Sequence, residues 1–441
     1  MRNRVIPLAL LLPPCLCLAQ VPPEPPLSLS VQQSMEMAVN NNLAVRLAKA
    51  GSASSRGKTL QAASSLLPRL LGTMSQTRVF LENLAAQGFN LIPLPISLLL
   101  GPFNSFDARI QLVQEVFDRG ATLRRSAASA AERSAALEEA LAREQVAAAA
   151  SLGYVELLRA RKAIEAAQAD VGLASELLQL AQDKQAAGTA AGIDVARAKT
   201  RGAEEKLRLL EARTVAQESD LRFKRVVVMP LGRTVALKDD LAFIPMRPPS
   251  LEDAVAAALR DRLELKISEE LFQSASSAWG AAQAERLPSV ALEGDIGLSG
   301  NRPDSNARTT GSAGVALKMP FFSGRAIEGR VAQAAGARSA AQAQLYDMRQ
   351  RVEEDARLAL TEVAAAIERV STADEALRLA ENELEMARDR FAAGVADNVE
   401  LLNSQTALGH ARDAQVGALA RYHAARINLS MALGRMMDFR F

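Results

Sequence analysis

An unbroken heptad pattern over residues 352–391 is the feature that most restricts the fold of this chain of 441 residues. Apolar or small side chains recur there at alternating spacings of four and three, as in a helix that packs along one stripe of its surface. The same alternation occurs 206 positions earlier, from Val146 to Gln185. If helix continues over residues 118–185 and 323–391, each helix is on the order of 100 Å long. This length favours a rod-like or hollow assembly over a compact core.

A short glycine-containing turn follows each predicted long helix, at residues 186–193 and 392–399. A second heptad stripe then runs from Leu401 to Ala432, so each turn leads into a helix that runs back. The composition suits this arrangement, because 49% of the residues are apolar but only 4% are aromatic. A chain rich in alanine and leucine forms thin helical layers more readily than a thick core. The sequence therefore predicts two long helical hairpins.

The chain also repeats itself. Residues 31–45 resemble residues 251–265 at an offset of 220, and later matches such as Gly188 with Gly394 have an offset of 206. A period of this length is too long for a solenoid repeat and indicates a duplicated half-protein. We expect a first repeat at 20–232, a connecting segment at 233–249, a second repeat at 250–434 and a tail at 435–441.

The first 19 residues have the pattern of a cleavable secretory signal. Arg2 and Arg4 precede an apolar run, and Cys17 and Ala19 are small residues at the −3 and −1 positions. Cleavage after Ala19 would remove both cysteines of the chain and leave equal numbers of basic and acidic side chains. We therefore expect a mature protein without disulfides or thiolate chemistry and without overall attraction to nucleic acid. Neither cysteine lies in a convincing lipobox.

Between the helices the hydrophobic period changes to two, which is typical of strands. Apolar side chains alternate with polar ones over residues 106–112, 290–298 and 312–319, and residues 69–80 are a weaker fourth candidate. Strands of about ten residues with one apolar and one polar face are what a membrane β-barrel requires. A half-buried sheet of a soluble protein has the same pattern. Since barrels close with about eight strands or more, four strands per chain would require neighbouring chains to complete a barrel.

The sequence does not favour an enzyme. It contains no GxxxxGK[ST], HExxH or GxSxG motif. His410 and His423 are thirteen positions apart, which does not place two metal ligands on one face of a helix. Acidic pairs such as Glu353 and Glu354 suit a solvated helix face. We expect no catalytic residue, no cofactor and no metal site.

Together these features resemble the TolC family of outer-membrane efflux and secretion channels. The resemblance rests on five segments, in this order and partly duplicated: residues 31–45, residues 251–265, the junction Pro320–Gly324, the turn Arg390–Asn403 and the ending Ala432–Gly434. It implies a mainly helical homotrimer. Each chain would give four strands to a twelve-stranded barrel in outer-membrane lipid, and the barrel would continue as a helical tunnel across the periplasm.

The resemblance also implies a function and partners. The protein would be the passive outer-membrane exit channel of a tripartite efflux or type I secretion system, working with a periplasmic adaptor and an inner-membrane transporter. Two alternatives are a secreted coiled-coil structural or adhesin-like protein and a periplasmic adaptor subunit. The first does not explain the duplicated amphipathic strands, and adaptors carry one hairpin with soluble β-rich domains.

The candidate site is the pair of tip turns. Asp194 and Glu400 match across the repeat at offset 206, and we expect them to line a constriction at the periplasmic end. Asp397 suits either this gate or a helix N-cap. Asn403 stands where many family members have aspartate, so we expect no second charged ring. The turn residues expected to contact an adaptor are Gly188, Gly192, Gly394 and Val395.

The apolar segment 88–103 is an insertion in the first repeat, between two candidate strands. It fits either a loop folded over the barrel rim or a lid over the extracellular mouth, since an exposed apolar patch would otherwise promote association.

Overall fold

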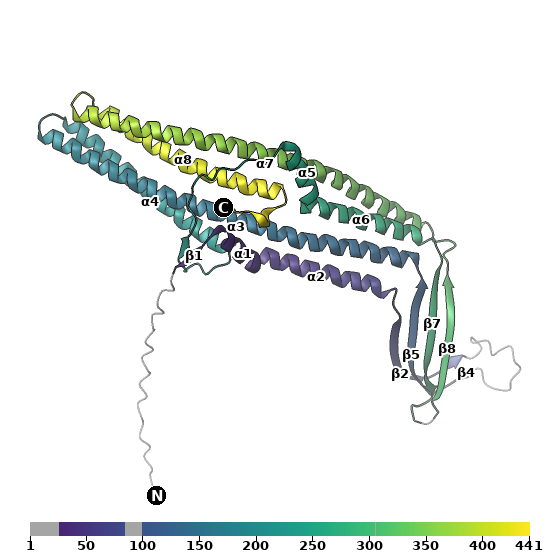
Figure 1. The fold of residues 1–441 in the computed structure, drawn as a ribbon. Helices are drawn as coiled ribbons and strands as arrows, with labels where there is room; N and C mark the ends of the chain where they lie inside the picture. The colour runs from purple at the N-terminus through teal and green to yellow at the C-terminus, as the bar shows by residue number, and fades with distance from the viewer. Residues whose placement is uncertain (1–25, 84–98, 305) are drawn as a thin grey trace, which may run out of the picture.

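A computed structural model describes residues 26–83, 99–304 and 306–441. The chain forms an elongated molecule with a four-stranded sheet at one end and two helical turns at the other (Figure 1). The expected signal sequence lies outside the described residues, and so does most of the apolar segment 88–103. Within the described part of the chain, no helix has both the length and the apolar character needed to cross a membrane.

The long elements follow the same order in the two halves of the chain. The first half contains β1 (Leu27–Leu29), α1 (Val31–Asn41), α2 (Leu43–Ser64), β2 (Arg69–Val79), β3 (Glu82–Asn83), β4 (Leu99–Leu100), β5 (Phe103–Phe117), α3 (Arg119–Ala186) and α4 (Gly192–Val226). The second half contains β6 (Val235–Leu237), α5 (Leu251–Asp261), α6 (Leu263–Ala284), β7 (Ser289–Gly300), β8 (Arg308–Lys318), α7 (Ala326–Ala392), α8 (Asn398–Ala432) and the 3₁₀ turn η3 (Met436–Asp438).

Corresponding helices of the two halves have equal or nearly equal lengths. α1 and α5 have 11 residues each, α2 and α6 have 22, and α4 and α8 have 35. The long helices α3 and α7 have 68 and 67 residues. On this correspondence we propose that the two halves are copies of one unit, with the boundaries expected from the sequence.

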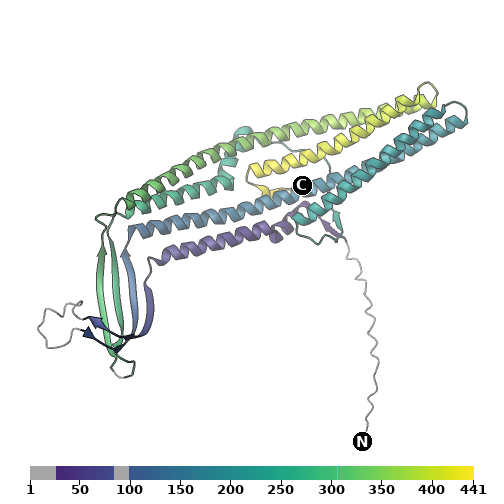
Figure 2. The ribbon, with the colours of Figure 1, turned by 180° about the vertical axis from the view of Figure 1, so that it is seen from behind.

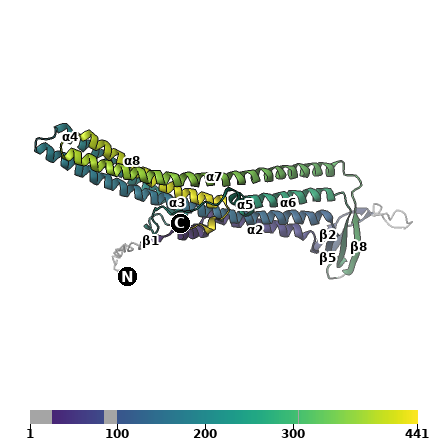
Figure 3. The same ribbon diagram turned by 45° about the horizontal axis from the view of Figure 1, so that its top comes forward.

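The helices lie nearly parallel along the molecule. Figure 2 shows the same arrangement from behind, with the strands turning away from the helix axes at the sheet end. In Figure 3, α3 and α7 run most of the length, with α2 and α6 beside them towards the sheet and α4 and α8 beside them towards the tips. α3 packs against α1, α2, α4, α6 and α8, whereas α7 packs against α5, α6 and α8.

The heptad stripe of α7 is the buried face of that helix. Eleven of its twelve predicted positions are buried and Leu377 is half-buried. The matching stripe of α3 is less sharply defined, since α3 packs against five other helices and buries residues on more than one face. α7 begins at Ala326 instead of near residue 323, because Gly324 and Arg325 have φ angles of 58° and 65°, outside the right-handed helical region.

The four long strands form one antiparallel sheet in the order β2-β5-β7-β8. β5 of the first half pairs with β7 of the second, so the sheet joins the two halves. All four strands predicted from the two-residue period are present, and the expected class of long helical hairpins with four long strands is confirmed. The sheet is open within one chain, with β2 and β8 at its edges. The chain also forms a parallel pair, β1 with β6, and the short pair β3 with β4.

The largest hydrophobic cluster lies midway along the molecule, where the described C-terminal residues return to α3 (Figure 1). It joins α1, α3, α4 and η3, and its central side chain is Tyr154, which has no exposed surface. The Tyr154 hydroxyl donates to the Leu29 carbonyl at 2.9 Å. This cluster fixes the hairpins at their base, and the tips extend away from it.

Candidate functional site: the tip turns and the faces of the sheet

The first tip turn connects α3 to α4. Gly188 has a φ of 75°, which only glycine adopts without strain, and the chain reverses there. The Thr189 amide donates to the Lys184 carbonyl at 2.9 Å and closes the turn. Asp194 lies in the first turn of α4, where its carboxylate accepts from the Ala191 amide at 3.1 Å and lies 3.8 Å from the Arg197 guanidinium. Asp194 is therefore held by its own helix start.

The second tip turn has the same form. Gly394 has a φ of 76°, and the Val395 amide donates to the Arg390 carbonyl at 3.0 Å. The Asp397 carboxylate accepts from the Glu400 amide at 3.0 Å, so Asp397 is the N-cap of α8. Glu400 forms an ion pair with Arg390 at 2.9 Å.

The remaining predicted tip residues are Gly192, Val395 and Asn403. Val395 has 68% of its surface exposed and is available for contact. Asn403 is exposed on α8, three positions beyond Glu400. Gly192 starts α4, and a Cβ added there would lie 3.3 Å from the Gln185 Nε2 atom. The structure thus places all predicted tip residues in or next to the two turns.

The structure also joins the two tips through residues that the sequence did not single out. The Asn398 side-chain amide donates to the Asp194 carbonyl at 2.9 Å. The Lys184 ammonium donates to the Ala392 carbonyl at 3.1 Å and lies 4.8 Å from the centre of the Phe391 ring. The sequence contains one signal for the role of Lys184, because Lys184 and Arg390 are both basic and match at offset 206. The contacts themselves depend on how the hairpins align.

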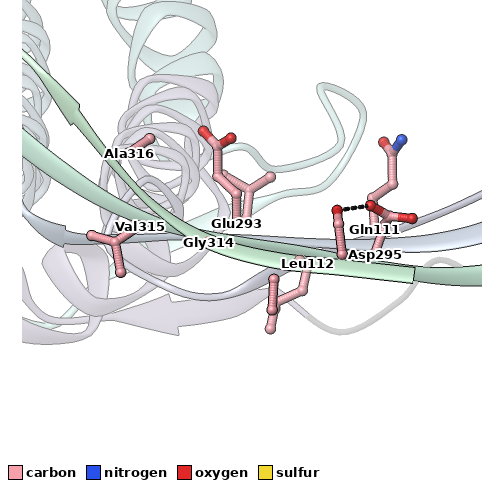
Figure 4. A pocket seen from close by; sticks show the side chains of 11 residues that line it. Gln111, Leu112, Glu293, Asp295, Gly314, Val315 and Ala316 are labelled. Atoms are coloured by element: carbon pink, nitrogen blue, oxygen red, sulfur yellow. Dashed lines mark hydrogen bonds between the residues drawn. The ribbon is translucent and has the colours of Figure 1, made fainter.

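The sheet has two chemically different faces. Figure 4 shows Gln111, Glu293 and Asp295 on one side of the strands and Leu112 and Val315 on the other. Neighbouring strands share each face, because the paired positions are in register. The apolar face is exposed in one chain. Its exposed large side chains are Leu70, Met74, Ile110, Leu292, Ile296, Leu298, Val315 and Leu317.

An ion-pair network crosses the polar face of the sheet. Arg109 of β5 pairs with Asp107 of its own strand and, at 3.2 Å, with Asp295 of β7. Ser312 of β8 donates to Asp295 (Figure 4). Gly297, the residue opposite Arg109, leaves room for this arrangement, since a Cβ there would lie 2.5 Å from the Arg109 Cβ. The polar face therefore connects strands of both halves of the chain.

The described residues contain no group of three or more histidine, cysteine, aspartate or glutamate side chains that could hold a metal ion. His410 is exposed. His423 is fully buried, with its Nε2 atom 2.9 Å from the Ala242 carbonyl oxygen and its ring stacked on Phe441 at 4.3 Å.

Comparison with known proteins decides the family resemblance. Residues 254–435 match the sequence profile of the family described as "Outer membrane efflux protein". A comparison with curated proteins gives no match. The resemblance to the TolC family is confirmed. The second half of this TolC-like chain carries the sequence match, and the whole fold carries the structural likeness.

Several solved structures share the fold of the TolC-like chain. The outer membrane protein VceC of Vibrio cholerae has a TM-score of 0.81 at 20% identity, covering 92% of this chain and 96% of VceC. The CmeC outer membrane channel of Campylobacter jejuni has a TM-score of 0.82 at 17% identity, with 92% and 86% coverage. The open-state MtrE outer membrane channel of Neisseria gonorrhoeae has a TM-score of 0.79 at 17% identity, with 92% and 89% coverage.

CmeC and MtrE are described as outer membrane channels and VceC as an outer membrane protein, and none of the three is described as an enzyme. The profile match assigns the chain to the cell outer membrane.

Proposed function

We propose that three copies of this chain form a passive exit channel through the outer membrane. The observation that carries the proposal is the open four-stranded sheet, with one exposed apolar face, one polar face and unpaired edges at β2 and β8. Edges of this kind pair with neighbouring chains, and an apolar outer face with a polar interior suits a membrane barrel. Three chains would give twelve strands, and the hairpins would continue the barrel as a tunnel.

The channel would take its driving force from partners. An inner-membrane transporter would drive export and a periplasmic adaptor would connect it to the tips, in tripartite efflux or in type I secretion. The exposed turns with Gly188, Gly192, Gly394 and Val395 would contact the adaptor. Asp194 and Glu400 would line the gate, with Asp397 holding the start of α8 and Asn403 one turn further along.

The alternative, a secreted or periplasmic coiled-coil structural or adaptor protein, accounts for the hairpins alone. It gives no reason for an apolar sheet face that is exposed in the single chain. Val315 belongs to the apolar face and Gly314 to the polar face, where a Cβ would meet nothing within 4 Å. This pair of positions therefore provides a matched test.

The experiment compares Val315→Lys with Gly314→Lys in the full chain expressed in cells. On the lipid-facing side of a barrel, a lysine near the bilayer midplane costs about 2–4 kcal/mol. We expect Val315→Lys to lose most heat-modifiable trimer from the outer-membrane fraction and Gly314→Lys to keep it. Equal amounts of trimer for both variants, or a wild-type protein that is a monomer in mild detergent, would contradict the proposal.

A further inference from the structure

The surface along which the two hairpins meet changes character towards the tips. Near the tip, Leu384, Leu401 and Leu408 form one apolar cluster of the α7–α8 hairpin, and Leu177 of α3 joins it from the other hairpin. Beside this cluster, one face of α8 is polar, with Asn398, Gln405, Gly409 and Arg412 at helical spacing. Nearer the base the same face is apolar again and joins the central cluster. The polar stretch is therefore local and lies close to the tips.

Two ion pairs join the hairpins in this stretch, and the residue of α8 is basic in one pair and acidic in the other. Arg412 of α8 pairs with Asp170 of α3 at 2.5 Å. The next residue, Asp413, pairs with Arg208 of α4. α8 thus presents a positive and then a negative side chain, and the other hairpin presents the complementary charges. We call Asp170, Arg208, Arg412 and Asp413 the hairpin clasp.

The clasp is anchored in the interior of the chain at Asp170, whereas the side chain of Asp413 is 51% exposed. Asp170 is 4% exposed. Arg208 also contacts Glu205, at 3.3 Å, and Glu205 is 1% exposed and has a second ion pair with Arg201 at 2.6 Å. Gly409 leaves the space in which the charges meet, since a Cβ there would lie 3.1 Å from the Arg208 Nη1 atom and 3.4 Å from the Asp170 Oδ2 atom.

Stability alone does not account for charges at this place. A buried ion pair is often no more stabilising than apolar side chains of similar volume, because both ions lose hydration. Gln405, one turn from Gly409, is 2% exposed, and neither polar atom of its side chain has a hydrogen-bond partner. The best-attested use of buried polar groups between helices is to fix their register.

We infer that the hairpin clasp sets the axial register of the two hairpins and so holds both tip turns at one level. A slip of one helical turn, about 5.4 Å, would separate every charge of the clasp from its partner. The tip contacts Asn398–Asp194 and Lys184–Ala392 require the same alignment. The inference rests on the proposed function, since it makes the clasp a set of positioning residues for the proposed gate.

The test places a reporter between the clasp and the tips. Glu176 of α3 and Arg388 of α7 are both exposed, with their charged groups 3.9 Å apart. In a chain with Cys15→Ser and Cys17→Ser, the changes Glu176→Cys and Arg388→Cys allow crosslinking by a short bismaleimide, measured by intact mass on purified protein. The reporter leaves the clasp, the tip contacts and the proposed gate unchanged.

Three clasp variants are compared in this background. Asp170→Arg places two arginines together, and we expect the crosslinking rate to fall about tenfold and the closed-state leak of single channels to rise. The swap Asp170→Arg with Arg412→Asp restores the pair in reverse, and we expect both readouts to recover substantially. The third, the apolar clasp variant, replaces all four charges by Asp170→Leu, Arg208→Met, Arg412→Met and Asp413→Leu. It should keep the thermal midpoint of the wild type, with a lower crosslinking rate and a larger leak.

The apolar clasp variant decides between register and simple packing. If it folds with an unchanged crosslinking rate and an unchanged leak, the clasp is ordinary packing and the inference is wrong. Should Asp170→Arg fail to fold, the swap and the apolar variant still give the answer. The crosslink requires no pore, so a wild-type protein that forms no channel would contradict the proposed function and leave the register result standing.

Discussion

At the scale of single residues, His423 couples the fold to pH. Its ring is buried beside Arg426, whose Nη1 atom lies 3.3 Å from the His423 Nδ1 atom. Burial is the main cause that lowers the pKa of His423 from 6.5 to about 4; the hydrogen bond to Ala242 opposes this shift and the Arg426 charge adds to it. The unfolded chain therefore binds a proton at a higher pH than the folded chain does. The contribution of neutral His423 to the free energy of unfolding is complete above pH 6.5. This contribution is lost as the pH falls from 6.5 to about 4.

We expect this histidine to account for up to about 3 kcal/mol of destabilisation at pH 4. The variant His423→Gln keeps an amide that can donate to Ala242 but does not titrate. Its thermal midpoint should fall less steeply than the wild-type midpoint between pH 6.5 and 4. The matched control is His410→Gln on the same helix, because His410 is exposed. Identical slopes for His423→Gln and the wild type would show that His423 does not carry this pH dependence.

Only some residues of the candidate site could be predicted from the sequence. Asp194 and Glu400 stand out in the sequence because they match across the repeat, and Gly188 and Gly394 because a tight turn requires a positive φ. The partner of Asn398 could not be predicted, because the Asp194 carbonyl is 204 positions away in the sequence. The two groups come together only when the two hairpins are aligned. The gate role of the acids stays a prediction.

At the scale of elements, the heptad stripe of α7 gives a direct test of packing. Ala373 is buried in a cluster that also contains Ala418 and Tyr422 of α8, whereas Glu375 is exposed two positions away. Ala373→Leu adds volume where two helices need a small side chain, and overpacking typically costs about 1–3 kcal/mol. We expect a lower thermal midpoint and less trimer. Glu375→Leu introduces the same side chain into the same helix and should change little. Equal losses for the two variants would mean that the stripe is assigned to the wrong face.

Periodic elements were predictable and aperiodic ones were not. Helices of 67 and 68 residues and strands of 11 to 15 residues carry many repeats of their period, so their type and approximate bounds follow from the sequence. β1 and β6 have three residues each, and β3 and β4 have two. Strands this short contain hardly one period. The parallel pairing of β1 with β6 further depends on segments about 200 positions apart meeting at the base of the hairpins.

At the scale of the whole molecule, the two halves of the chain act together at both ends. At the sheet end β5 pairs with β7, and Arg109 links the same two strands across the polar face. At the tip end Asn398, Lys184 and the hairpin clasp join the hairpins. Each chain can therefore contribute a complete segment of wall to the proposed trimer, with its own strands, its own stretch of tunnel and its own pair of tips.

At the tip end of that trimer, Asp194 and Glu400 would line the proposed gate. Two acids from each of three chains would share one constriction, and acidic rings favour cations over anions. In the structure, however, Glu400 is paired with Arg390 at 2.9 Å, and Asp194 lies 3.8 Å from Arg197. Each acid therefore has a basic neighbour that reduces its effect on a passing ion. We expect a cation-selective channel, partly blocked by multivalent cations, with a small conductance when closed.

Single-channel recordings in planar bilayers measure these properties for a graded series of variants. Asp194→Ser with Glu400→Ser should reduce the cation selectivity and the block, and should raise the leak if the acids also hold the tips together. Arg390→Gln frees the Glu400 carboxylate and should act in the opposite direction on selectivity, while Asn403→Asp adds a second acidic ring and should strengthen the block. If the double serine variant keeps the wild-type selectivity and block, Asp194 and Glu400 serve only the local structure of their helices and the constriction lies elsewhere in the tunnel.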